Sequence, residues 1–119
     1  MKVCFLVDEN LSPRLKTSVL NLNPTIDIIR VGEINAPALA TLDPDILSYL
    51  ELSKRLLVTD NRKSMPGHLE QYWAEGGTIW GLFWVRPGAS LGEIAEAIYV
   101  VWEVSEAEEW LDRLDWIPF

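Results

Sequence analysis

Short apolar runs of strand length alternate with helical segments along this chain of 119 residues, and this alternation constrains the fold more than any other feature. Runs rich in apolar and β-branched residues predict four strands, at Lys2 to Val7, Thr25 to Val31, Arg55 to Thr59 and Thr78 to Val85. Strands that alternate with helices pair in parallel through helical crossovers. The sequence therefore predicts an α/β fold with a mainly parallel sheet of four to five strands flanked by helices.

Local signals mark where the helices begin. Ser12-Pro13 combines a capping side chain with a proline suited to the first helical position, and Asp43-Pro44 repeats that pattern. Ser90 is followed three residues later by Glu93, which makes a capping box. Other expected elements are a loop from Gly32 to Leu42, a helix from Pro66 to Glu75, a short helix from Glu106 to Leu114, and an edge strand at Trp116 to Pro118.

Size and composition predict one domain that spans residues 1–119. A chain this long buries roughly two thirds of the surface that it exposes when unfolded, which is enough for a core without disulfides. Cys4, the only cysteine, lies in an apolar run, so we expect a buried small hydrophobe rather than a reactive thiol. Early acids disfavour a signal peptide, and no apolar run reaches the ~20 residues of a membrane span. We therefore expect a soluble, cytoplasmic protein with no membrane partner.

The net charge of -8 is distributed unevenly. Up to Gly92 the acids and bases nearly balance, whereas from Glu93 onward Arg113 is the only base. The acids of this C-terminal segment are Glu93, Glu96, Glu103, Glu106, Glu108, Glu109, Asp112 and Asp115. The rest of the chain can therefore present bases to a polyanion, although charge on solvated helix faces explains the same pattern.

Polar side chains follow the predicted strands where each strand ends. Asp8 follows the first, Glu33 comes shortly after the second, and Asp60 follows the third, while Asp43 opens a helix. Ligands of parallel sheets bind beyond these carboxyl ends. Clustered carboxylates need a compensating cation, and hard oxygen ligands suit Mg²⁺ or Mn²⁺. The three aspartates therefore predict a metal-dependent phosphodiesterase. The alternative is that Asp43 only caps its helix and that Asp8 and Asp60 are turn residues.

Other catalytic motifs receive no support. No phosphate-binding GxxxxGK[ST] occurs, and no GxGxxG follows the first strand. His68 is the only histidine and has no cysteine partner nearby in sequence, so it is poor evidence for zinc. Together with Leu69, Tyr72 and Trp73, it is expected to form a packing surface.

Four segments carry a resemblance to a known family: FLVDENLSPRL, IIRV, LDPDILSYLELSKRLLVTDNR and the terminal WIPF. In these segments the chain resembles the short PIN-like proteins, relatives of the VapC toxins of bacterial toxin–antitoxin pairs. The resemblance covers nearly the whole chain. It implies a three-layer Rossmann-like PIN fold, an acidic Mg²⁺ site and endoribonuclease activity, with Asp8 and Asp43 as two of the acids.

The third acidic element departs from the family pattern. PIN-like proteins commonly have T-x-D-x-D-F after the third strand, whereas this chain has Thr59-Asp60-Asn61-Arg62-Lys63-Ser64. Asn61 stands where the ligand aspartate is expected, so either Asp60 or Asn61 completes the predicted metal site. An amide binds Mg²⁺ more weakly than a carboxylate does. The remaining residues assigned to the site are Arg62, Lys63 and Asn10 for substrate binding and Glu9 as a supporting group.

Two functions remain open at this point. The first is a metal-dependent ribonuclease of the toxin–antitoxin type, with RNA and a cognate antitoxin as partners. The second is an inactive PIN-like module that acts by homo-oligomerisation or by binding a partner encoded nearby. All six tryptophans lie in the C-terminal half, and the helix from Ser90 carries Tyr99 and Val100 outside its core stripe. Such aromatic residues either anchor an interface or fill one side of the core.

Overall fold

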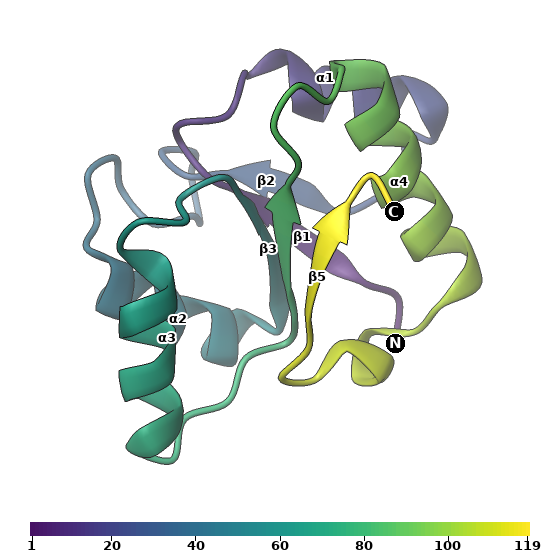
Figure 1. Cartoon of the computed structure of the whole chain (residues 1–119). Coiled ribbons are helices and arrows are strands. Elements are labelled where there is room, and N and C mark those ends of the chain that lie inside the picture. Colours follow the sequence, from purple (N-terminus) through teal and green to yellow (C-terminus); the bar gives the residue numbers. More distant parts are fainter.

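A single five-stranded sheet lies between two layers of helices in the computed structural model, which describes residues 1–119 (Figure 1). All neighbouring strands are parallel, and their order is β2-β1-β3-β4-β5. The elements are β1 (Cys4–Val7), α1 (Arg14–Leu22), β2 (Ile28–Arg30), α2 (Asp43–Ser53), β3 (Arg55–Thr59), α3 (Met65–Ala74), β4 (Leu82–Val85), α4 (Leu91–Val104), the 3₁₀ helix η1 (Ala107–Trp110) and β5 (Leu114–Ile117). The predicted α/β class and parallel sheet are confirmed, and the three layers are compatible with a Rossmann-like fold.

The two faces of the sheet bury separate cores. Successive side chains of a strand point to opposite faces. Phe5 and Val7 accordingly pack into a cluster of 18 buried residues with α1 and α4, whereas Leu6 packs into a cluster of 11 with α2 and α3. A sheet covered on both faces requires strands that are apolar throughout, as these short runs are.

The chain order places a crevice between β1 and β3. After β1 the chain moves outward to β2, and it then returns to form β3 on the opposite side of β1. The helices that follow these two steps, α1 and α2, lie on opposite faces of the sheet. In doubly wound sheets the loops diverge at such a reversal, and ligands bind beyond the strand ends there. The fold therefore makes the carboxyl ends of β1 and β3 the first place to look for a site.

Several predicted boundaries are wrong. The second strand covers only Ile28–Arg30, and the fourth begins at Leu82 rather than Thr78. Gly81 has a φ of 108°, a left-handed conformation that interrupts a strand before β4. The short helix predicted up to Leu114 ends at Trp110, and the following residues form the edge strand β5, which is longer than predicted.

The predicted helix starts fare unequally. Ser90 and Glu93 form the predicted capping box of α4, with both reciprocal hydrogen bonds at 3.1 Å. Asp43 does not cap α2 as predicted, because Leu42 occupies the N-cap position and no side chain caps that helix. The Asp43 carboxylate is consequently available for contacts outside its own helix. None of the helices is both long enough and apolar enough to cross a membrane.

Candidate functional site

Asp8 and Thr59 meet across the crevice between β1 and β3. Asp8 directly follows β1, and its main-chain N–H donates to the Val58 carbonyl oxygen at 3.0 Å, which fixes the segment to β3. The Thr59 hydroxyl donates to one carboxylate oxygen of Asp8 at 2.7 Å, and the Glu9 N–H donates to the other at 2.8 Å. Thr59 is completely buried and is the only polar residue among the buried residues of the chain. A buried hydroxyl needs such a partner, so the pair is fixed in place.

The environment of Asp8 disfavours its charged form. Partial burial raises the pKa of the Asp8 carboxyl, because desolvation penalises the carboxylate. The hydrogen bonds from Thr59 and the Glu9 N–H oppose that shift, while the charges of Asp60 and Glu9 add to it. No lysine or arginine forms a salt bridge with Asp8. The site thus contains a partly buried acid without a compensating protein cation.

Asn61 connects this pair to Asp43 on α2. The Asn61 N–H donates to the Thr59 hydroxyl oxygen at 3.0 Å, and the Asn61 side-chain NH₂ faces both carboxylate oxygens of Asp43 at 3.3 and 3.4 Å. The Ser64 hydroxyl also donates to Asp43, at 2.7 Å. A continuous hydrogen-bonded chain therefore runs from Asp8 through Thr59 and Asn61 to Asp43. Two of the three predicted acids are joined in this way, although they are distant in sequence.

Asp43 occupies the first residue of α2, where the helix dipole stabilises a negative charge. Its side chain is only 18% exposed, and the His68 Nε2 lies 4.0 Å from the carboxylate. No lysine or arginine pairs with Asp43 either. Both acids of the site therefore depend on neutral hydrogen-bond donors.

Other residues assigned to the site from the sequence lie beside this chain rather than within it. Asp60 is exposed and forms no side-chain hydrogen bond with Asp8 or Asp43, although its charge acts on Asp8. It lines a hollow of about 540 Å³ next to Asn61. The further residues around that hollow are Asn10, Arg62 and Lys63. The three residues predicted to bind substrate therefore surround one concavity that adjoins the acids.

Two predicted glutamates have structural partners. Glu9 accepts a hydrogen bond from the Ala40 N–H at 2.9 Å and so anchors the loop that precedes α2. Glu33 forms a salt bridge with Lys16 at 2.5 Å and accepts a hydrogen bond from the Arg30 N–H. Glu33 is thus occupied with its own loop and α1. Glu9 supports the site indirectly, because the loop that it anchors leads to Asp43.

Ser64 and His68 were not assigned to the site from the sequence. The helix that carries His68 does pack through the buried Leu69, but the imidazole is 46% exposed and faces Asp43. Ser64 and His68 are four residues apart and therefore lie on the same side of α3. They line a second hollow of about 300 Å³ with Asp43. The sequence signal that could have identified these two residues was their four-residue spacing, directly after the polar turn that follows β3.

The donor set can be compared with the needs of a divalent cation. No group of three His, Cys, Asp or Glu side chains has an arrangement that would hold a metal. The hard oxygen ligands at the crevice are the carboxylates of Asp8 and Asp43 and the amide oxygen of Asn61. Mg²⁺ commonly binds one or two carboxylates and completes its shell with water and substrate phosphates. The Asn61 NH₂ faces Asp43, so its amide oxygen could act as a third ligand only after the amide rotates.

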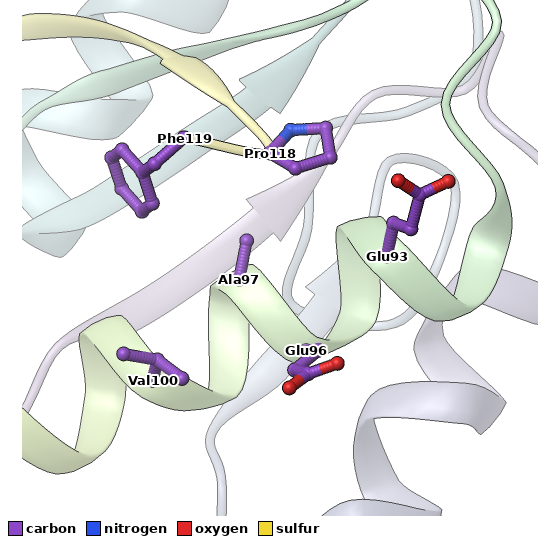
Figure 2. A pocket seen from close by; sticks show the side chains of 6 residues that line it. All are labelled: Glu93, Glu96, Ala97, Val100, Pro118 and Phe119. Atoms are coloured by element: carbon purple, nitrogen blue, oxygen red, sulfur yellow. The ribbon is translucent and has the colours of Figure 1, made fainter.

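A different concavity lies on the opposite layer, between α4 and the C-terminus. Figure 2 shows Ala97 pointing toward Pro118 and Phe119, with Val100 one turn further along α4. The groove has a volume of about 240 Å³, and Glu93 and Glu96 complete its lining. Apart from these two glutamates, its lining is apolar.

Comparison with known proteins finds no similarity: no family model, no curated protein and no solved structure matches the chain. The class of protein therefore rests on the structure itself. It is a three-layer α/β domain with an all-parallel five-stranded sheet, whose polar residues gather where the strand order reverses.

Proposed function

We propose that the protein is a PIN-like, metal-dependent ribonuclease in which Asp8, Asp43 and Asn61 hold Mg²⁺ or Mn²⁺. The observation that carries this proposal is the pairing of Asp8 and Asp43 through Thr59 and Asn61 at the strand reversal. Two carboxylates in one hydrogen-bonded chain, without a lysine or arginine partner, have charge that a divalent cation would balance. The resemblance to PIN-like proteins agrees with this chemistry.

The residues of the chain have separate roles in this proposal. Asp8 and Asp43 supply charged ligands, Asn61 supplies a neutral oxygen ligand after its amide rotates, and Thr59 keeps Asp8 oriented. A bound divalent ion supplies an activated water and stabilises charge on a scissile phosphate. Arg62 and Lys63, exposed beside Asn61, attract the phosphodiester and hold it next to the acids.

The test combines metal binding with RNA cleavage. Calorimetry with Mn²⁺ should show binding to the wild type and none to Asp8→Asn, and cleavage of single-stranded RNA should be lost in the same variant. Asp45→Asn is the matched control, because Asp45 is an exposed acid two residues along α2 and should leave both properties unchanged. A wild type that binds no metal at millimolar concentration would refute the proposal, as would equal cleavage by Asp8→Asn.

A second function is favoured by a specific observation. The Asp43 carboxylate already accepts hydrogen bonds from neighbouring side chains. Asn61 and Ser64 occupy the directions from which a cation would approach, as expected of a PIN-like module that no longer hydrolyses RNA. Such a module would act through the α4 groove. Val100, which lines the groove, is 42% exposed, and no charged residue forms a salt bridge with Glu93 or Glu96.

The charge of the groove indicates its partner under this second function. Glu93 and Glu96 border an apolar floor, so the occupant is a partner segment with an apolar side chain flanked by lysine or arginine. Self-association through the same groove would bring like charges together across a two-fold axis. Sedimentation at micromolar concentration separates the cases, because homo-oligomerisation gives a dimer or larger species, whereas dependence on a basic partner leaves the isolated chain monomeric.

A further inference from the structure

Residues at or next to the carboxyl ends of four strands form a row across one face of the sheet. Thr59 of β3 pairs with Trp84 of β4, and Trp84 pairs with Trp116 of β5. Asp8 joins the other end of this row through its hydrogen bond with Thr59. Neighbouring strands lie about 4.8 Å apart, so Trp116 is roughly three strand spacings, or about 14 Å, from Asp8. The acidic site and Trp116 therefore both lie at the carboxyl ends of the strands.

Two arginines from different loops meet over the Trp116 ring. The Arg62 guanidinium carbon lies 5.3 Å from the ring centroid and the Arg86 carbon lies 5.9 Å from it, which are cation–π distances. Trp116 is itself supported by Trp84, with the ring centroids 6.4 Å apart. Arg86 is further fixed because its Nε donates to the Pro118 carbonyl oxygen at 2.6 Å. Both guanidinium groups therefore lie within cation–π distance of one ring, and both residues line the same hollow.

These arginines have no acidic partner. No salt bridge of the chain includes Arg62 or Arg86, even though Asp60 lies close to both. Arg62 and Asp60 line the hollow of about 540 Å³ on the side of Asn61. They also line a separate hollow of about 390 Å³, whose lining includes Arg86. Two concavities therefore meet at Arg62 and lead from Arg86 toward the acidic site.

We propose that Arg62 and Arg86, positioned by Trp116, form a phosphodiester-binding subsite for single-stranded RNA. Guanidinium groups bind phosphate oxygens through paired N–H donors, and an ordered guanidinium loses less entropy on binding than a free one. A single strand can bend its backbone into adjoining hollows at a loop edge. The choice of RNA rests on the function proposed above. The subsite adds to it a second contact, beside Trp116, that fixes the path of the strand.

Fluorescence anisotropy with a labelled single-stranded RNA, in EDTA so that no metal is present, measures the subsite directly. Each lost guanidinium should weaken binding about tenfold or more. The Arg62→Glu/Arg86→Glu variant should also make the fall of log affinity with log salt concentration less steep. The magnitude of the slope should decrease by about 1.4, because each phosphate contact in a single strand contributes ~0.7. Lys54→Glu is the control, because Lys54 stacks on Trp80 at the opposite edge of the sheet and should change neither quantity.

The role of Trp116 is tested by rescue. Trp116→Leu should weaken RNA binding severalfold, while Trp116→Tyr, which keeps an aromatic face for the guanidinium groups, should restore it at an equal melting temperature. Unchanged affinity and salt slope in the double arginine variant would overturn the subsite, as would equal losses in Lys54→Glu. Absence of any RNA binding by the wild type would overturn it too. Binding that depends on Arg62 and Arg86 without cleavage would support the subsite and refute only the nuclease.

Discussion

Asn61→Asp is the substitution that tests the proposed metal site most closely. It introduces the carboxylate that the resemblance to PIN-like proteins leads us to expect at this position. It also replaces an amide that donates to Asp43 with a group that repels it. Because the amide nitrogen lies 3.3 and 3.4 Å from the two Asp43 oxygens, the new carboxylate would face Asp43 at nearly that distance. Without metal, the variant should therefore be less stable than the wild type.

The size of the effect follows from Coulomb's law. Two unit charges 3.4 Å apart, the longer of the two distances, repel by about 5 kcal/mol at an effective dielectric constant of about 20, and by about 1 kcal/mol in water. Asp43 is 18% exposed, so the loss of stability at neutral pH should lie between these limits. A domain of this size loses about 3 to 6 °C of melting temperature for each kcal/mol. Metal at a hundred times its dissociation constant should return about 2.7 kcal/mol.

Thermal unfolding in EDTA and in Mn²⁺ is the assay. Asn10→Asp is the control, because Asn10 is exposed and lines the same hollow, so the same added charge should have little effect. The metal-dependent rise in melting temperature should be larger in Asn61→Asp than in the wild type. Equal stability of the two variants in EDTA, with no additional rise in Mn²⁺, would refute the assignment of Asn61 as a metal ligand.

Two further predictions concern stability. Partial burial raises the pKa of the Asp8 carboxyl above its ordinary value, so the native fold binds this proton more tightly than the unfolded chain does and loses stability as pH rises from the ordinary pKa through the raised one. In EDTA, Asp8→Asn should therefore gain stability relative to the wild type across that interval and keep the gain above it; a difference independent of pH in thermal unfolding would contradict this. Ser90→Ala removes one half of the α4 capping box and should cost about 1 kcal/mol in urea denaturation, whereas a midpoint equal to that of the wild type would contradict the role of this cap.

The sequence was most informative where local chemistry is self-contained. The capping box at Ser90 depends only on Ser90 and Glu93, and it forms as predicted. Asp43 does not cap its helix, because α2 begins one residue earlier than predicted, and its carboxylate instead contacts Asn61 and Ser64. Asn61 and Ser64 lie 18 and 21 residues away in sequence, and only the folded chain brings them to α2. Propensity at a helix start cannot anticipate such a contact.

The boundaries of β4 and β5 depended on another distant contact. Asp112 has a φ of 54°, and its carboxylate accepts hydrogen bonds from the Ile79 N–H at 2.9 Å and from Trp73 Nε1 at 2.8 Å. These bonds hold residue 79 away from a regular strand and position the chain that enters β5. The apolar character of residues 78–85 predicted one longer strand, because nothing local reveals that its first residues pair with an acid in the last segment.

The tryptophans and Cys4 illustrate the limits of composition. Trp84 and Trp110 are buried, at 7% exposure each, and fill the core, while Trp116 lies at the edge beneath two arginines. Cys4 is only partly buried rather than a core residue, although burial still raises the pKa of its thiol. The position of Asp8 was predictable because it depends on topology. The residues that share its site required the register between β1 and β3, which sets Asp8 beside Thr59, and the position of α2.

The central claim is that Asp8, Asp43 and Asn61 bind one divalent cation. Crystals soaked in Mn²⁺ and measured at the manganese absorption edge test it directly. We predict one anomalous peak between the two carboxylates, about 2.0 to 2.2 Å from its oxygen ligands, with the amide oxygen of Asn61 turned toward it. A structure without that peak at millimolar Mn²⁺, with the Asn61 NH₂ still donating to Asp43, would contradict the account.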